Sequence, residues 1–260
     1  MLRKLTRCIL PQIRELLFGK KILESGIVIS IHFFFLYNKG MKKFIIILII
    51  VVSTLVLAVC TPFAILGFRT AALNVDYNYL MEDEKYNTKT EVLGLELVTQ
   101  HISCGYACIE MMSTYYGNRV SEDDLDAKNN GGVSTSSSDG FLKEINRSID
   151  NQIFVKHSYL KNDKLLKEIH NSLSSNNPVA IEWAAKFEDD WTLHFSIVTG
   201  LDITHDEVVV YNPYGYIETI SVSEFIGRIS FKSYQNLPLF LNFGFAFGAF
   251  EKNTIFFVES

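Results

Sequence analysis

The sequence is poor in proline, cysteine and charged side chains. Its 260 residues include 5 Pro, 4 Cys and 15 Gly, and 20% are Asp, Glu, Lys or Arg, whereas 48% are hydrophobic. So little Pro and Gly excludes a collagen-like or low-complexity chain, and the apolar content excludes broad disorder. The length is sufficient for one domain with appendages, or for two small domains, around a sizeable core.

Positive charge is scarce in the larger part of the chain. Residues 1–69 carry ten Lys or Arg against two acidic residues, whereas residues 70–260 carry 14 against 27. An acidic surface without a basic cluster repels a phosphate backbone. We therefore expect no nucleic-acid partner.

The cysteines form no visible disulfide framework or metal motif. Cys8 and Cys60 lie in or before an apolar region, and Cys104 and Cys108 lie one helical turn apart. Two cysteines on one face of a helix are poorly placed for a disulfide, and they are too few ligands for zinc. We interpret Cys108 as a small buried residue, which leaves a single reactive thiol to explain.

One apolar run, Phe44–Phe68, reaches the roughly 20 residues that a helix needs to cross a bilayer. Basic residues precede it and acidic residues follow it, so the positive-inside rule predicts a cytoplasmic N-terminus. The sequence thus predicts a single-pass cell-membrane protein with its larger part outside the cytoplasm. The predicted segments are a basic segment at 1–43, a transmembrane helix or uncleaved signal anchor at 44–68, a polar linker at 69–90 and a folded domain at 91–260.

Two alternatives concern processing of the N-terminal region. The Met-Lys-Lys at 41–43 before the apolar run is also typical of a secretory signal peptide, and residues 1–40 then precede the true start. Residues 57–60 resemble a lipoprotein cleavage box, although Val59 stands where a small residue is required.

A second apolar segment, residues 237–250, is too short for a routine span. We expect it to form a core-lining loop or strand. The alternative is a surface that dips into the membrane.

Within the domain, helical periodicity precedes strand patterns. Apolar residues repeat at helical spacing from 91 to 149, Ser121 and Asp124 form a helix cap, and Asn162-Asp163 can cap a further helix that ends before Pro178. Strand patterns follow at 179–183, 193–201, 207–211 and 216–222. This order predicts an α+β domain in which a helical layer packs against an antiparallel sheet.

The segment from Gln100 onward places a cysteine at the start of a helix. Cys104 runs directly into an apolar helical pattern, so free N–H groups and the helix dipole are expected to favour its thiolate. Gly105 is expected to leave space for a substrate carbonyl. The Gln100 amide, beside the Cys104 backbone N–H, is placed to donate to the oxygen that becomes negative during acyl transfer.

One histidine out of six is well placed to serve as a base for this thiol. His194 opens a strand pattern, and an imidazole fixed on a strand can present one nitrogen to the thiol. Asn212, at the end of the next strand, can accept a hydrogen bond from the other nitrogen. Cys, His and Asn in this order match the papain-like triad. The remaining histidines are interpreted as exposed to solvent, as hydrogen-bonded within the core, or as too far from the thiol by topology to act as its base. They are His32, His101, His157, His170 and His205.

These motifs resemble those of the bacteriocin-processing cysteine peptidases, family 39 of the papain-like proteases. The resemblance covers roughly residues 91–231. It rests on the Gln-x-x-x-Cys-Gly-x-Ala start, a Tyr-Tyr-Gly helix end at 115–117, the strand that opens at His194, and the Asn212-Pro213 turn followed by Ser-x-Phe at 223–225.

The resemblance implies a papain-like fold and hydrolysis of peptide bonds in a peptide or protein substrate. It assigns Cys104 as nucleophile, His194 as base and acid, Asn212 as the residue that orients the imidazole, and Gln100 as oxyanion donor. This chemistry requires no metal or cofactor.

The chain departs from the family pattern in three ways. The family more often has Asp or Asn at Ser103, and Asp at Asn212, whose charge would stabilise the imidazolium. No Gly-x-x-x-x-Gly-Lys-Ser/Thr motif occurs, which predicts a stand-alone enzyme or a partner of a separate transporter. Two alternatives stay open: an acyl or peptidyl transferase with the same triad, and a degenerate domain that binds peptides without cutting them.

Overall fold

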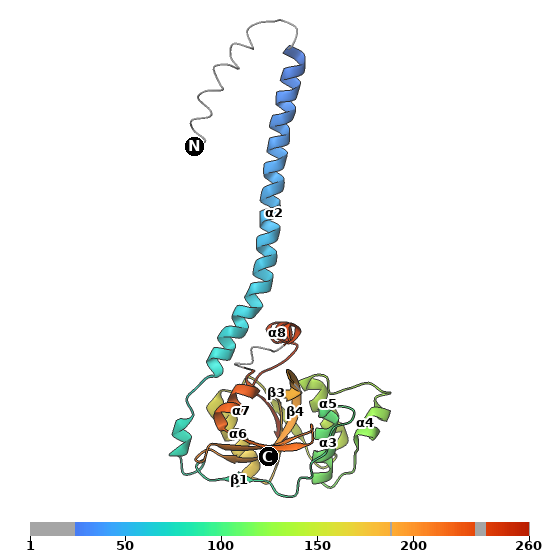
Figure 1. Ribbon diagram of the computed structural model, residues 1–260, viewed down its shortest axis with the longest axis vertical. Helices are drawn as coiled ribbons and strands as arrows, with labels where there is room; N and C mark the ends of the chain where they lie inside the picture. Colours follow the sequence, from blue (N-terminus) through green and yellow to red (C-terminus); the bar gives the residue numbers. More distant parts are fainter. Residues whose placement is uncertain (1–23, 188, 232–237, 260) are drawn as a thin grey trace. The chain divides into compact units, whose positions relative to one another are not determined.

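The computed structural model describes the backbone of residues 24–187, 189–231 and 238–259, and side chains from residue 41 onward. The chain divides into two compact units, Met1–Cys60 and Thr61–Ser260. Figure 1 gives the order of the elements along the chain. The predicted basic segment 1–43 lies largely outside the described side chains.

Helix α2 runs through Glu24–Leu73 and contains the whole apolar run. Its apolar side chains from Phe44 to Val59 are exposed. Among the described residues it is the one helix that is long and apolar enough to cross a membrane, judged by length and composition. The helix begins well before Phe44 and continues past Phe68 to Leu73, with Pro62 and Gly67 inside it.

Seven strands form one antiparallel sheet in the described part of the second unit. Their order is β2-β7-β3-β4-β5-β6, and β1 pairs with β4. The strands are β1 (Thr90–Glu91), β2 (Phe154–His157), β3 (Val179–Phe187), β4 (Asp190–Asp202), β5 (Glu207–Asn212), β6 (Tyr216–Ile220) and β7 (Thr254–Val258). The predicted α+β class with an antiparallel sheet is confirmed. Strand β7, which inserts between β2 and β3, has no counterpart among the predicted strands.

Helices cover both faces of this sheet, whereas the sequence pattern predicts one helical layer (Figure 1). Helices α3 (Cys104–Tyr115) and α5 (Ser138–Ser148) pack on one face, and α6 (Asn162–Ser174) and α7 (Val222–Ile229) pack on the other. The short helices are η1 (Asn78–Met81), α4 (Glu122–Lys128), which packs beside α3, and α8 (Leu239–Ala246).

Strand β3 shows why both faces are covered. Val179, Ile181 and Trp183 are buried among α6 and α7, whereas Ala180, on the opposite face, is buried among α3 and α5. Successive side chains of a strand point to opposite faces, so a central strand between two helical layers buries side chains on both of its faces. Trp183 is fully buried in this core.

Two predicted helix starts have different outcomes. Ser121 and Asp124 form the predicted capping box at the start of α4. Asn162 does not cap α6, because the N-cap is Lys161 and makes no side-chain cap hydrogen bond. The Asn162 side chain is instead buried and accepts a hydrogen bond from Asn253 at 3.2 Å.

The segment 69–90 is polar in composition but contributes to the core. Leu73, Leu80 and Tyr86 are all buried, and the last two belong to the cluster around α6 and α7. These three apolar residues therefore pack against the domain, while most charged residues of the stretch stay exposed.

Helix α8 forms within the second apolar segment, so the expectation of a loop or strand is wrong for residues 239–246, whereas 247–250 are a loop and residue 237 lies outside the described residues. Leu241 and Phe245, four residues apart, are buried on one side of this helix. Residues four apart share a helix face, and this spacing is present in the sequence.

Candidate active site

Helix α3 begins at Cys104, as the sequence pattern predicts. Ser103 is its N-cap residue, and the Ser103 hydroxyl accepts a hydrogen bond from the Tyr106 N–H at 3.1 Å. Serine is favoured at this position because it satisfies a helix N–H that lacks a partner within the helix. Cys104 is half-buried, whereas Cys108 is fully buried one turn later.

A buried carboxylate fixes the segment before the cysteine. Glu122 accepts hydrogen bonds from the backbone N–H groups of His101, Ile102 and Ser103, at 3.1, 2.9 and 3.0 Å. Glu122 is itself held by α4, whose capping box begins at the preceding residue. The sequence analysis does not single out Glu122; an acidic residue directly after a helix cap carries little signal of its own.

Gly105 is required for packing rather than for an open space. A Cβ atom at this position would lie 2.3 Å from Oγ1 of Thr135. Gly105 is buried, so the expectation that it leaves room for a substrate carbonyl is wrong. The glycine instead allows the loop that contains Thr135 to approach α3.

Burial dominates the protonation of the cysteine. Removal from water raises the pKa of Cys104, although backbone N–H groups of Phe195, Gly105 and Cys104 itself act in the opposite direction. The expectation that the helix start favours the thiolate is therefore wrong in its net direction. The resting side chain is a thiol at neutral pH.

His194 is buried on β4 and bonded to Asn212. Its Nε2 atom lies 2.9 Å from Oδ1 of Asn212. The ring of Tyr214 stacks on the imidazole, with 4.0 Å between the ring centroids. Burial lowers the pKa of His194 to about 3, so the imidazole is neutral near pH 7.

The cysteine and the histidine lie at the same end of the sheet. The β4–β5 ladder ends at the Ile197–Tyr211 pair, where β5 is one residue from its end at Asn212, and His194 lies on the part of β4 beyond this ladder. The backbone N–H of Phe195, the residue after His194, lowers the pKa of Cys104 against the effect of burial, which places β4 beside the thiol. Burial raises the pKa of Tyr214 to about 12, and the charge of Cys104 acts in the same direction. Cys104 thus influences the ring that stacks on His194.

Glu218 determines which way the Asn212 amide faces. Nδ2 of Asn212 donates to Oε1 of Glu218 at 2.8 Å. A carboxylate is an acceptor only, so the amide nitrogen must face Glu218 and the amide oxygen must face His194. The Tyr214 N–H also donates to this oxygen, at 3.0 Å. His194 then donates through Nε2, which leaves Nδ1 as the acceptor of the neutral ring.

Arg228 pairs with Glu218. Its guanidinium lies 2.6 Å from Oε2 of Glu218, donates through Nε to the Ala184 carbonyl at 2.9 Å, and lies 3.5 Å from the ring centroid of Trp183. Arg228 is buried inside an otherwise apolar face of α7. The sequence analysis does not single out Glu218 or Arg228, although a charged residue on an apolar helix face was a usable signal.

Gln100 lies beside the turn that follows Asn212. Its backbone N–H donates to the Pro213 carbonyl at 2.8 Å. Its side-chain oxygen is buried and has no hydrogen-bond partner within the described part of the chain. The structure thus brings Gln100 near Asn212, but it shows no contact between the Gln100 amide and Cys104.

Four other histidines have partners away from Cys104. His101 contacts Asp123, His157 contacts Glu168, His170 contacts Thr88 and His205 contacts Asp202. His32 precedes the described side chains. Of the six histidines, His194 is therefore the one that the described contacts link to Asn212.

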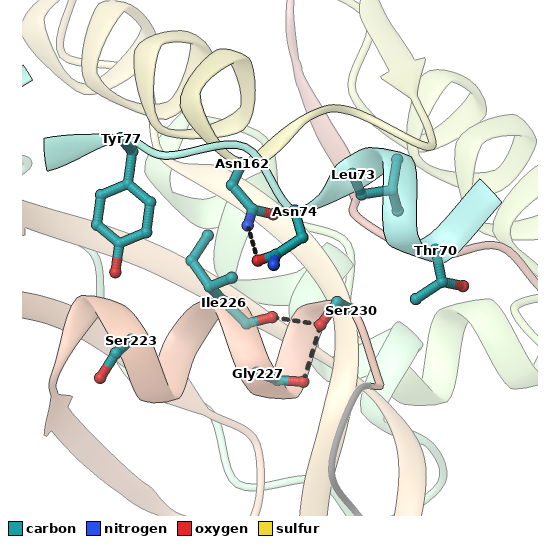
Figure 2. Close-up of a pocket in the computed structure, with 9 residues that line it drawn as sticks. All are labelled: Thr70, Leu73, Asn74, Tyr77, Asn162, Ser223, Ile226, Gly227 and Ser230. Atoms are coloured by element: carbon teal, nitrogen blue, oxygen red, sulfur yellow. Dashed lines mark hydrogen bonds between the residues drawn. The ribbon is translucent and has the colours of Figure 1, made fainter. Parts of the chain in front are cut away.

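A pocket of about 250 Å³ lies elsewhere, between the end of α2 and α7. Figure 2 shows Thr70, Leu73 and Asn74 opposite Ser230, with Asn162 bonded to Asn74. None of the four predicted site residues lines this pocket. Among the described residues, no group of three His, Cys, Asp or Glu side chains could hold a metal ion.

A match to a protein-family model shows to which family this chain belongs. The Peptidase_C39 like family matches residues 92–237, which is more than half of the chain. The chain belongs to the Peptidase_C39 like family. This membership indicates a cysteine peptidase. No curated protein matches the chain.

Two solved structures are similar to this Peptidase_C39 like chain, each with 15% sequence identity. One is a double glycine motif protease from an AMS/PCAT transporter in complex with the leader peptide, with a TM-score of 0.42; the match covers 66% of this chain and 99% of that one. The other is the peptidase domain of Streptococcus ComA, a bi-functional ABC transporter involved in a quorum sensing pathway, with a TM-score of 0.41; the match covers 64% of this chain and 98% of that one.

Proposed function

We propose that this protein is a membrane-tethered cysteine peptidase in which Cys104 is the nucleophile and His194 the general base. The observation that carries the proposal is the 2.9 Å hydrogen bond from His194 Nε2 to Asn212, on the strand that follows on to Phe195, whose backbone N–H lowers the pKa of Cys104. This bond leaves Nδ1 free to take the thiol proton. Family membership supports the same chemistry.

The first step forms a covalent acyl-enzyme. Because the thiol and the imidazole are both neutral at rest, proton transfer from Cys104 to His194 accompanies attack of sulfur on the substrate carbonyl carbon. The carbonyl π electrons move to oxygen and give a tetrahedral oxyanion. When that intermediate collapses, the C–N bond breaks and His194 gives its proton to the leaving amine.

Gln100 and the helix start are proposed to stabilise the oxyanion. The buried end of the Gln100 side chain has no partner, and rotation of the amide by 180° places its NH₂ donor there. The Cys104 backbone N–H, at the first position of α3, supplies a second donor.

The second step releases the acyl group. Water, deprotonated by His194, attacks the thioester carbonyl, and the C–S bond breaks as sulfur recovers a proton from the imidazolium. If an amine attacked in place of water, the enzyme would be a transferase. The experiment below therefore compares water and an added amine as acceptors of the acyl group.

Glu218 and Arg228 are proposed as positioning residues. They contact the amide of Asn212 rather than the reacting atoms, and they keep its oxygen on the imidazole. The Glu218 carboxylate lies one hydrogen bond beyond the position where the family more often has Asp. Its charge is offset by Arg228, so the imidazolium gains little from it.

The apolar part of α2 is proposed as a single membrane anchor. The basic residues before Phe44 and the acidic excess after residue 69 support an extracytoplasmic catalytic domain in the cell membrane. Its proposed partners are a peptide or protein substrate and, in the absence of a nucleotide-binding motif in this chain, a separate transporter.

The test uses the full chain in detergent, a peptide probe with a thiol-reactive group, and intact-mass spectrometry. In a Cys8→Ser, Cys60→Ser background, which removes the exposed thiol of Cys60, we expect one adduct, which Cys104→Ala abolishes. His194→Ala should slow labelling by about 10²- to 10⁴-fold, because it removes the base. Asn212→Ala should slow it by about tenfold or more, because the ring loses its orientation.

Cys108→Ala is the matched control and should label at the wild-type rate, because Cys108 is fully buried. Equal labelling of Cys108, or an unchanged rate in His194→Ala, would contradict the triad. Turnover of a peptide substrate with and without an added amine then separates hydrolysis from transfer by the mass of the product.

A further inference from the structure

Helix α8 presents an apolar surface that the protein leaves uncovered. Leu239, Phe240 and Phe247 are exposed by 72%, 67% and 59%, and Phe243 is partly exposed. Residues 238–250 contain no charged side chain. A contiguous exposed apolar patch is rare on a protein surface that faces water.

The opposite side of α8 is fixed to the domain. Leu241 and Phe245 are buried in a small cluster with Ala184 and Phe231, and the rings of Phe231 and Phe245 lie 4.6 Å apart. The exposed residues therefore belong to a packed helix. Rotating them inward would expose Leu241 and Phe245 instead, so the domain cannot bury both sides of α8 by itself.

Helix α8 contacts the final apolar turns of α2. The rings of Phe63 and Phe243 meet edge to face, with 5.2 Å between centroids. Leu66 packs on the cluster that holds α8. Ile65 and Phe68, on the same turns of α2, are exposed. The uncovered surface of α8 thus continues into the end of the apolar run.

The length of the run indicates what surrounds this end. Residues 44–68 span about 37 Å as a helix, whereas the hydrocarbon core of a bilayer is about 30 Å thick. If the run starts at one face of the bilayer, Phe63 and Phe68 reach the opposite interface. Aromatic side chains are enriched at such interfaces.

We infer that α8 is a second membrane contact, which lies in the membrane–water interface and buries Leu239, Phe240, Phe243 and Phe247 in lipid. This inference rests on the proposed membrane anchor. Its occupant is the bilayer, because the surface is continuous with a lipid-exposed helix and carries no charge for a polar partner. A domain held at two points has a fixed orientation on the membrane, whereas a single helix leaves it free to rotate.

The cluster under α8 also reaches the proposed active site. Leu193, the residue before His194, packs against the cluster that holds Leu241 and Phe245. The membrane contact and the strand that presents the base are therefore parts of one packed structure.

The test uses the full chain in phosphatidylcholine–phosphatidylglycerol vesicles with a photoreactive diazirine side chain at single positions. Phe240 is the test position, and Val52 reports the anchor. Ile153, exposed by 65% before β2, is the matched control. We expect lipid adducts from positions 52 and 240, several-fold above the yield from position 153.

Each outcome separates the two proposals. Lipid adducts at 52 but not at 240 leave the anchor intact and overturn the inference about α8. Adducts at neither position overturn both. A crosslink from 240 to a second copy of the chain, or to an added peptide, with no lipid adduct assigns the surface to that occupant and also overturns the inference.

Discussion

The two sides of the candidate site are each held by an acidic side chain, but in different ways. On the cysteine side, Glu122 accepts hydrogen bonds from three successive backbone N–H groups. On the histidine side, Glu218 contacts only the Asn212 side chain and is paired with the buried Arg228. The first arrangement fixes main chain, and the second fixes a series of side chains.

This difference determines how each side should respond to substitution. On the cysteine side one carboxylate serves all three N–H groups, so a substitution that keeps an acceptor oxygen at this position preserves the loop, whereas complete loss of the side-chain acceptor removes all three bonds. A series of side chains fails at any missing member, because each orients the next, and the loss of Glu218 also leaves the buried Arg228 with the more distant Glu224 carboxylate, at 3.7 Å, in place of its 2.6 Å partner. We therefore expect the histidine side to be the more sensitive of the two.

The largest effect should come from Glu218→Leu. We expect the free energy of unfolding to fall by about 3 to 4 kcal/mol, because the buried guanidinium of Arg228 loses its nearest carboxylate and keeps only the more distant Glu224. The rate of probe labelling at Cys104 should fall as well, because the Asn212 amide is free to turn. Guanidinium denaturation in detergent micelles and labelling kinetics measure the two effects.

A double variant separates stability from positioning. Glu218→Leu with Arg228→Met removes both charges and should recover most of the stability, since a hydrophobic pair can replace a buried ion pair. Labelling should stay slow, because Asn212 still lacks its acceptor. Recovery of both properties would show that Glu218 has only a structural role. The single variant Glu218→Gln keeps an acceptor for Asn212 and should label faster than Glu218→Leu.

A third acidic residue, Glu182, extends the comparison to a carboxyl without a cation. It is buried on β3, accepts a hydrogen bond from Ser138, and its other oxygen has no partner among the described residues. Burial raises its pKa from 4.5 to about 7. A raised carboxyl pKa favours the folded state below pH 4.5, and this stability is lost as the pH rises through 7.

Glu182→Gln should remove that loss. At pH 8 we expect a gain of about 3 kcal/mol in the free energy of unfolding, measured by denaturation across a pH series. His194 acts with the opposite sign, because burial lowers its pKa from 6.5 to about 3, so its contribution is lost as the pH falls below 6.5. The two slopes oppose each other in the wild type between pH 4.5 and 6.5. The variant should therefore lose stability on acidification in this window, and an unchanged pH profile would refute the assignment.

The smallest effect should come from Glu122→Gln on the cysteine side. The amide keeps one acceptor oxygen for the three N–H groups, so we expect a loss of about 1 to 2 kcal/mol, from weaker hydrogen bonds to a neutral group. Labelling at Cys104 should slow far less than in Glu218→Leu. If Glu122→Gln slowed labelling more than Glu218→Leu, the proposed contrast between the two sides would be reversed.

The predictability of the site follows the same division. The positions of Ser103 and Cys104 at a helix start can be predicted from the sequence, because a cap and a helix start depend on neighbours in sequence. Glu218 and Arg228 are not, because their pairing depends on how β6 and α7 are placed. The protonation of Cys104 was misjudged for a related reason: the helix start is a local property, whereas burial is set by residues packed from elsewhere in the chain.

The fold shows a similar limit. Strands β3 to β6 follow from period and turn residues, and the α+β class follows from the order of elements. Strand β7 and the second helical layer were not predictable in this way. An insertion between β2 and β3, and the burial of β3 on both faces, are properties of the assembled sheet.

By itself the sequence determined the apolar run, the helix start at Cys104 and the order of Cys, His and Asn, because these depend on composition and spacing along one chain. Tertiary structure decided the rest. It directs the Asn212 amide through Glu218, makes Cys104 a thiol, and leaves one side of α8 uncovered. The amide direction, the thiol and the uncovered side of α8 each depend on which groups surround the side chain and exclude water from it. Those surroundings are fixed only when distant segments of the chain pack together.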